Sequence, residues 1–239
     1  MPATYALIAI NLAVYAAMVA TADAAHRLAF TPSQATEWGA IVASHLRQGE
    51  WWRLVTAMFL HGSLAHIAFN MIALYQIGSY LEPWYGSPRY LALYLIAGVA
   101  SSLASAWWYW SSPVPQVGAS GAIMALIGAG TVSAWRIGPR GRTLRNALIV
   151  WGVVTVLNSF VATANNAAHI GGFASGALAV LIFGRRGSEA IEQLSRDPVP
   201  PDDLQGAITC PSCHAGNRPG SRYCGSCGAP LPAPTVTPS

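Results

Sequence analysis

The sequence predicts an all-α, polytopic membrane protein with six membrane-spanning helices and a small separate module near its C-terminus. Hydrophobic residues make up 53% of the 239 residues and charged residues only 9%, whereas soluble proteins carry about 25% charged residues. Six segments are long and apolar enough for a membrane helix, which needs about 20 mostly apolar residues. All four cysteines lie after residue 209, in a polar region of different composition.

The six predicted helices are separated by short polar or turn-forming stretches, apart from one long loop. The first is followed by Ala22-Asp23-Ala24, which resembles a signal-peptide cleavage site. No basic residue precedes its apolar run, as a signal peptide requires, so we expect a retained membrane helix rather than a cleaved leader. The predicted helices cover residues 3–22, 64–81, 90–110, 120–135, 144–161 and 168–184.

The arginines predict the orientation of these helices. All 13 basic residues are arginine, and six of them flank predicted helices: Arg136, Arg140, Arg142, Arg145, Arg185 and Arg186. Because short loops rich in arginine stay in the cytoplasm, an even number of helices places both termini there. The uncharged loops 111–117 and 162–167 and the long loop 23–61 then face the outer side. This asymmetry accounts for the net charge of +4, so we expect no nucleic-acid partner.

The long outer loop carries three tryptophans, Trp38, Trp51 and Trp52. Tryptophan is enriched where a membrane meets water. We therefore expect Trp51-Trp52-Arg53 to lie half-submerged in the bilayer, with the arginine directed toward lipid headgroups.

Four polar residues near the outer ends of predicted helices define a candidate site. His66 and Asn70 are four residues apart, so they share one face of the second helix. Ser120 lies in the first turn of the fourth helix and His169 in the first turn of the sixth. All three helices run inward from the outer side, and we therefore expect the four side chains to reach the same depth in the membrane.

This set of groups is the one that acyl transfer needs. Ser120 is the candidate nucleophile, and His169 is the base that takes its proton. His66, Asn70 and the backbone N–H of Ser120 would stabilise the developing oxyanion. No aspartate or glutamate lies in the fourth or sixth helix, so a Ser-His dyad is predicted. Gly172 and Gly176 have the Gly-x-x-x-Gly spacing that lets two membrane helices approach closely.

These residues have other interpretations. Small residues such as Gly118-Ala119-Ser120-Gly121 commonly serve helix packing in membranes, and this role is compatible with a nucleophile. His61, His66 and His169 form an alternative metal site, although no carboxylate or cysteine completes it. The sequence contains no His-Glu-x-x-His motif, which argues against a zinc protease. We therefore expect no cofactor for catalysis.

Four motifs, in this order along the chain, resemble the rhomboid family of intramembrane serine proteases. The similarity covers residues 5–184 and therefore all six predicted helices. The motifs are Trp51-Trp52-Arg53, the run from His61 to Asn70 (His-Gly-Ser-Leu-Ala-His-Ile-Ala-Phe-Asn), Gly118-Ala119-Ser120-Gly121 and Ala168-His169-Ile170-Gly171-Gly172.

The resemblance implies roles for individual residues. Ser120 matches the family nucleophile, His169 its histidine partner, and His66 with Asn70 the side chains of the oxyanion hole. His61 matches a structural position, and Glu82 resembles a contact at a helix end. The chain departs from the family at Met124, where many members carry an aromatic residue against the histidine ring. The expected supporting residues are His61, Gly118, Gly121, Met124, Gly172 and Gly176.

The resemblance also implies a function. We expect an integral protein of the bacterial inner membrane that cleaves transmembrane segments of single-span or other membrane proteins near the outer leaflet. The substrate helix would enter sideways, past the fifth helix. The alternative is a catalytically silent relative that binds or escorts membrane helices. A transporter is disfavoured because neither internal repeats nor helices broken at mid-membrane are evident.

The four cysteines predict a zinc site. Cys210-Pro-Ser-Cys213 and Cys224-Gly-Ser-Cys227 are separated by ten residues, which is the paired spacing of a zinc ribbon with four thiolate ligands. Two disulfides are the alternative, but they are rare in the cytoplasm. The chain thus divides into a membrane domain (1–186), a proline-rich linker (187–206), a ribbon (207–231) that offers a surface for a cytoplasmic partner, and a disordered end (232–239).

Overall fold

The computed structural model describes residues 1–161, 165–183, 208–212, 214, 216–217, 224 and 231–232. A helix covers each of the six segments that the sequence predicted. These helices are α1 (Pro2–Thr21), α5 (Leu64–Tyr85), the continuous run of α6 (Ser87–Ala92), η2 (Leu93–Ala97) and α7 (Gly98–Trp108), then α8 (Ser120–Arg136), α9 (Arg142–Val161) and α10 (Asn166–Phe183).

The third of these helices contains a π-helical turn, η2. It begins at Ser87 and ends at Trp108, whereas the sequence predicted residues 90–110. By length and mean hydropathy, two helices of the described part are suited to cross a membrane, Pro2–Thr21 and Ser87–Trp108. The remaining long helices are shorter or more polar, as α8 with 17 residues illustrates. The prediction of six crossings therefore stays a prediction. The linker 187–206, Arg185, Arg186 and residues 233–239 lie outside the described residues.

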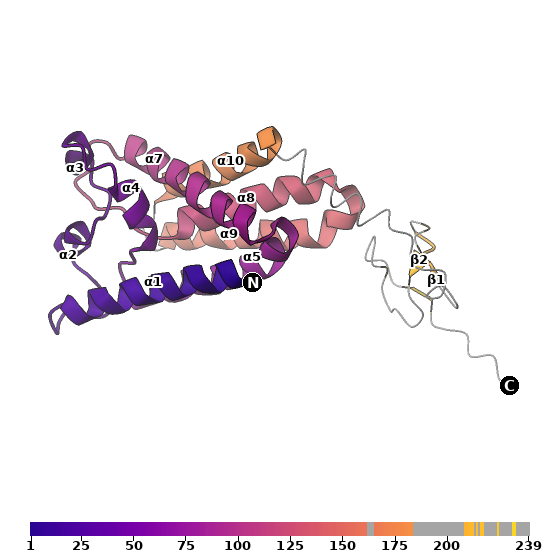
Figure 1. Cartoon of the computed structure of the whole chain (residues 1–239), viewed down its shortest axis with the longest axis horizontal. Helices are drawn as coiled ribbons and strands as arrows, with labels where there is room; N and C mark the ends of the chain where they lie inside the picture. Colours follow the sequence, from indigo (N-terminus) through magenta and orange to yellow (C-terminus); the bar gives the residue numbers. More distant parts are fainter. Residues whose placement is uncertain are drawn as a thin grey trace.

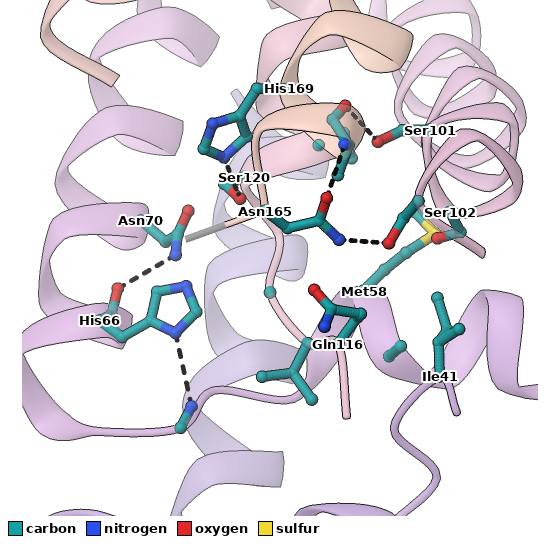
Figure 2. Close-up of a pocket in the computed structure, with 18 of the residues that line it drawn as sticks. Ile41, Met58, His66, Asn70, Ser101, Ser102, Gln116, Ser120, Asn165 and His169 are labelled. Carbon is teal, nitrogen blue, oxygen red and sulfur yellow. Dashed lines mark hydrogen bonds between the residues drawn. The ribbon is translucent and has the colours of Figure 1, made fainter. Parts of the chain in front are cut away.

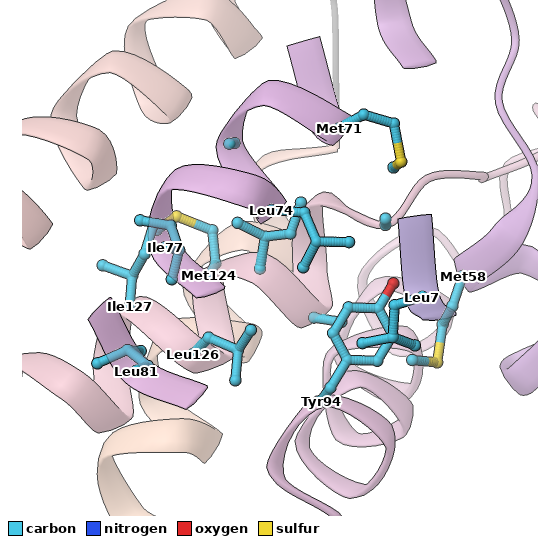
Figure 3. Packing of buried hydrophobic residues seen from close by; sticks show 14 of the residues in the cluster. Leu7, Met58, Met71, Leu74, Ile77, Leu81, Tyr94, Met124, Leu126 and Ile127 are labelled. Atoms are coloured by element: carbon cyan, nitrogen blue, oxygen red, sulfur yellow. The ribbon is translucent and has the colours of Figure 1, made fainter. Parts of the chain in front are cut away.

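Helix α8 lies inside the bundle and contacts most of the other long helices. It packs against α10, α7, α9 and α5, and Figure 1 shows it running between α7 and α10 on one side and α9 on the other. Twelve of its 17 residues are buried. Its apolar side chains join those of α5 and of the third helix in one hydrophobic cluster that includes Leu74, Ile77, Tyr94 and Ile127 (Figure 3).

The N-terminus of α1 is capped by a carboxylate from α5. Glu82 accepts hydrogen bonds from the backbone N–H groups of Ala3 (2.9 Å) and Thr4 (2.8 Å) and from the Thr4 hydroxyl (2.6 Å). The Ser87 hydroxyl donates a fourth bond, at 2.7 Å. A negative charge is favourable at a helix N-terminus, where the first N–H groups have no partner within the helix. Glu82 therefore holds α1, α5 and the start of α6 together at the end of the bundle away from the long loop.

The long loop folds into short helices at the opposite end of the bundle (Figure 1). These are α2 (Pro32–Glu37), α3 (Ala43–Arg47), α4 (Arg53–Thr56) and the 3₁₀ turn η1 (Ala57–Phe59). Backbone hydrogen bonds tie this loop to the segment before α8, since Ile41 and Gln116 exchange N–H and carbonyl bonds at 3.0 and 2.9 Å. The loop is thus a structured cap that fixes the entry to α8.

The expected direction of Arg53 is wrong. Its side chain is 5% exposed and points into the loop, where Nε donates to Glu50 at 2.6 Å and Nη1 donates to the carbonyls of Thr36 (2.6 Å) and Ala40 (3.1 Å). Buried carbonyl oxygens of an irregular loop need hydrogen-bond donors, and one guanidinium can donate to several acceptors at once. The neighbouring tryptophan, Trp52, is half exposed, as an interfacial anchor requires.

The described part of the C-terminal module contains a small antiparallel pair of strands, β1 (Ile208–Thr209) and β2 (Gly216–Asn217). The chain turns between them, and the N–H of His214 donates to the carbonyl of Cys210 at 2.9 Å. His214 takes a positive φ of 58° in this turn. The first cysteine of the predicted ribbon therefore lies at the start of a tight turn.

Candidate active site

A cavity of about 570 Å³ lies between the long loop and the helices α5, α7, α8 and α10. Ser120, His169, His66 and Asn70 all line it, and Figure 2 shows their side chains converging from three helices. The structure thus brings together the four residues that the sequence predicted to reach one depth.

Ser120 and His169 are in hydrogen-bond contact. The distance between Ser120 Oγ and His169 Nε2 is 2.8 Å, which is the reach that a nucleophile and its base require. His169 is 3% exposed, and its other ring nitrogen, Nδ1, has no hydrogen-bond partner in the described part of the chain. A neutral ring with its proton on Nδ1 leaves Nε2 free to accept the serine proton.

The backbone around Ser120 presents unpaired donors to the cavity. Ser120 is the first residue of α8, and Ala119 before it has no side-chain group that caps the helix. The first N–H groups of a helix lack intrahelical partners and carry the positive end of its dipole. Gly118 precedes this turn with φ of +128°, a conformation that is open to glycine and costly for other residues.

His66 and Asn70 lie across the cavity on α5. The N–H of Gly62 donates to His66 Nδ1 at 3.4 Å, so the ring proton is placed on Nε2. That nitrogen faces Gly118, because a β-carbon added at Gly118 would lie 2.9 Å from it. The amide nitrogen of Asn70, a residue only 1% exposed, donates to the His66 carbonyl at 3.0 Å. Its second N–H remains for a ligand in the cavity.

His61 supports this arrangement by packing. Its ring is fully buried and meets the His66 ring edge to face, with 5.0 Å between the ring centroids. Neither of its ring nitrogens is hydrogen-bonded to another described residue. His61 therefore restricts the orientation of the His66 ring by packing against it.

Glycines set the distance between the two helices that carry Ser120 and His169. A β-carbon at Gly172 would collide with the carbonyl oxygen of Gly121, and one at Gly176 with that of Ala125. A β-carbon at Gly121 would meet the Ser101 hydroxyl. The backbones of α8 and α10 thus touch directly, as the glycine spacing predicted.

Met124, at the position where many rhomboids carry an aromatic residue, is buried. It belongs to the main hydrophobic cluster, and Figure 3 shows it beside Leu74 and Ile77 of α5. It is not one of the described residues that line the cavity. Met124 therefore fills the α5–α8 interface below the site.

Three polar residues near Ser120 and His169 were not predicted from the sequence, namely Ser101, Ser105 and Asn165. The Ser101 hydroxyl donates to the carbonyl of Ala168 at 2.7 Å, and the amide nitrogen of Asn165 donates to the Ser105 hydroxyl. The side-chain oxygen of Asn165 also accepts from the N–H of Ala168 at 2.9 Å. The spacing of Ser101 and Ser105, four residues apart on one helix, was the available signal.

The predicted metal ligands are only partly described. Cys210 and Cys224 are both buried, whereas Cys213 and Cys227 lie outside the described residues. Among the residues that are described, no three histidine, cysteine or acidic side chains are grouped as metal ligands. This finding includes His61, His66 and His169, so the alternative metal site is not supported. Two buried cysteines with thiolate chemistry fit a zinc ribbon.

Comparison with known families identifies both parts of the chain. The family model of the rhomboid domain matches residues 48–186, and that of a zinc-ribbon domain matches residues 209–231.

Several curated proteins are similar in sequence. Rhomboid protease GluP of Bacillus subtilis (strain 168) is 40% identical over 151 residues, which are 62% of this chain and 29% of GluP. Rhomboid protease AarA of Providencia stuartii is 31% identical over 204 residues, 75% of this chain and 72% of AarA. RHOMBOID-like protein 5 of Arabidopsis thaliana is 37% identical over 141 residues, 58% of this chain and 46% of that protein. The chain therefore spans less than a third of GluP and most of AarA.

Proposed function

This chain belongs to the rhomboid family of integral membrane proteins and ends in a zinc-ribbon domain, and we propose from this that it is an intramembrane serine endopeptidase. The observation that carries the proposal is the 2.8 Å contact between Ser120 Oγ and His169 Nε2 in a cavity that His66 and Asn70 also line. Relatives named as proteases in two bacteria support it.

The proposed reaction uses only groups of this chain and water. Ser120 gives its hydroxyl proton to Nε2 of His169 while its oxygen attacks the scissile carbonyl carbon. The resulting oxyanion accepts hydrogen bonds from the Ser120 N–H, from Nε2–H of His66 and from the Asn70 amide. His169 then protonates the leaving amine as the C–N bond breaks. A water molecule then gives one proton to Nε2 of His169 while its oxygen attacks the ester carbon. The bond from that carbon to Ser120 Oγ breaks, His169 returns the proton to Oγ, and the acid product leaves.

The proposed substrates are transmembrane segments that reach the cavity sideways, between α5 and α9. Phe69 of α5 and Trp151 of α9 meet across this interface, with 6.2 Å between their ring centroids. Thr155, also on α9, lines the cavity. The aromatic pair therefore lies between the lipid and the site, where a substrate helix would have to displace it.

The proposed topology places the long loop outside and both termini in the cytoplasm of a bacterial cell, with six membrane crossings. The arginines at the ends of α8 and α9 support it under the positive-inside rule. The cytoplasmic ribbon would hold zinc through Cys210, Cys213, Cys224 and Cys227 and offer a surface to a partner there.

The decisive test replaces the nucleophile. We expect Ser120→Ala to lower kcat for a single-span model substrate by about 10⁴ or more, because the covalent route is lost. Its thermal unfolding midpoint should change little, since one oxygen atom is removed at the edge of a cavity. The variant should also fail to react with a fluorophosphonate that labels the wild-type serine. Undiminished cleavage by Ser120→Ala would refute the assignment and favour another nucleophile.

A further inference from the structure

The helix that carries His169, α10, is hydrogen-bonded to α7. Neither Ser120 nor His169 belongs to α7. His169 is the fourth residue of α10 and therefore lies in its first turn. The start of a helix has few intrahelical bonds and frays most easily. The distance between His169 and Ser120 therefore depends on what fixes this turn.

Asn165 is the cap of α10. Its side-chain oxygen accepts from the N–H of Ala168 at 2.9 Å, three residues on, and its backbone carbonyl accepts from the N–H of His169 at 3.3 Å. This is the geometry of an asparagine N-cap, which satisfies one of the unpaired donors of a helix end. The capping residue Asn165 and the proposed base His169 thus lie within the same first turn of α10.

Two serines of α7 form hydrogen bonds with this first turn of α10 and its cap. The Asn165 amide donates to the Ser105 hydroxyl, and one helical turn earlier the Ser101 hydroxyl donates to the Ala168 carbonyl at 2.7 Å. Figure 2 shows Ser101 and Asn165 beside the turn that carries His169. Ser101 also touches α8, since a β-carbon at Gly121 would collide with its hydroxyl.

Burial makes these contacts specific. Ser101 and Ser105 are 2% and 1% exposed, so their hydroxyls have no free access to bulk water. A buried hydroxyl left without a partner is costly, which disfavours any displacement of the α10 turn away from the two serines of α7. Van der Waals contact alone lacks this directionality.

We propose that Ser101, Ser105 and Asn165 form a positioning clamp that holds the first turn of α10 so that His169 Nε2 stays within reach of Ser120. The proposal rests on the dyad mechanism proposed above. The three are positioning residues, because their hydrogen bonds go to the backbone and cap of α10 and not to Ser120 or His169 side chains.

The test compares Ser105→Ala and Asn165→Ala with the wild-type chain in cleavage of a single-span substrate. We expect kcat to fall about ten- to a hundredfold with little change in KM, because small misplacement of a catalytic group is costly. The rate of fluorophosphonate labelling should fall in parallel. The double variant should lose little more than the worse single one, since both act through one bond.

Two further variants separate positioning from general stability. Asn165→Asp keeps the cap and can accept a bond from the Ser105 hydroxyl, so it should restore most of the kcat that Asn165→Ala loses. Ser175→Ala is the matched control. Its hydroxyl also ties α10 to the third helix, through the Ala97 carbonyl at 3.1 Å, but lies six residues after His169. This control should lower the unfolding midpoint as much as Ser105→Ala and leave kcat unchanged.

Hydrogen exchange gives a readout that needs no activity. In Ser105→Ala and Asn165→Ala, amides at the start of α10 should exchange at least about tenfold faster, while those of α8 keep their protection. Unchanged kcat and unchanged exchange in both variants would overturn the clamp, as would an equal loss of kcat in Ser175→Ala. A wild-type chain that neither cleaves nor labels would refute the proposed protease instead, and exchange would still decide the clamp.

Discussion

At the scale of single residues, packing and chemistry use the same positions. Gly121, Gly172 and Gly176 bring the backbones of α8 and α10 into contact, and that contact is what lets Ser120 and His169 meet at 2.8 Å. The small residues of α8 and α10 therefore serve both helix packing and the placement of Ser120 against His169. The short hydrogen bond between Ser120 and His169 depends on the close approach of the two helices.

Gly172→Ala tests this link. Its new β-carbon would collide with the Gly121 carbonyl, so the helices must separate, and we expect a loss of about 1–3 kcal/mol in unfolding free energy together with at least tenfold lower kcat. Gly152→Ala is the matched control, because its β-carbon would meet only Ile127, at an ordinary 3.6 Å. The control should be neutral or stabilising, as alanine favours helices. Equal behaviour of the two variants in thermal unfolding and cleavage would contradict the argument.

At the scale of elements, the helices divide into a fixed group and a more loosely attached one. Helices α7, α8 and α10 are joined by glycine contacts and by the hydroxyl bonds of Ser101 and Ser175. Helix α9 packs mainly on α8, and its contact with α5 includes the aromatic pair Phe69–Trp151. Movement of α9 therefore costs less than movement of any helix that carries the dyad.

Phe69→Ala tests whether this pair limits access. An aromatic pair contributes about 1 kcal/mol beyond its buried area, so its loss should raise kcat/KM for a transmembrane substrate up to about fivefold. Cleavage of a short soluble peptide should not change, because it does not need to part α5 from α9. Tyr75→Ala is the control, since Tyr75 forms a similar pair with Tyr5 between α5 and α1, at 6.4 Å. Slower cleavage of the membrane substrate by Phe69→Ala alone would contradict lateral entry here.

At the scale of the whole molecule, polar groups fix the two ends of the bundle. Glu82 joins α1, α5 and α6 at one end, and Arg53 orders the long loop at the other. The hydrogen bond from the His45 ring, followed by that from the Arg53 guanidinium, lowers the pKa of the Glu50 carboxyl below its usual value. Because the folded-state pKa is lowered, this contribution to stability is fully present above the ordinary pKa of glutamate and is lost as the pH falls from that value through the lowered pKa of Glu50.

The orientation and the ribbon can be tested together, because the first 209 residues contain no cysteine. In spheroplasts, a membrane-impermeant maleimide should label Ser111→Cys, on the predicted outer side, but not Thr143→Cys. The wild-type chain should stay unlabelled until the membrane is permeabilised. Its four thiols should then react fully only after a chelator removes about one zinc per chain, measured by metal analysis. Labelling of the wild-type chain in intact spheroplasts would reverse the topology, and metal-free thiols would refute the zinc site.

The sequence alone was sufficient to predict the six long helices, the order of the motifs and four of the residues that converge on the cavity. Helix periodicity and apolar length are local properties, and the rule that places arginines inside assigns Ser120, His66, Asn70 and His169 to one depth. The rhomboid and zinc-ribbon matches confirm the family that those motifs indicated.

The tertiary structure alone showed the contacts that position the predicted Ser120–His169 pair. Ser105 and Asn165 are 60 residues apart, so no local pattern shows that this hydroxyl and this amide meet. Arg53 points inward because loop carbonyls and Glu50 accept its hydrogen bonds, and Met124 lies in the hydrophobic cluster that α8 shares with α5. Depth in the membrane follows from each segment's own composition, whereas contact depends on how several helices pack against one another.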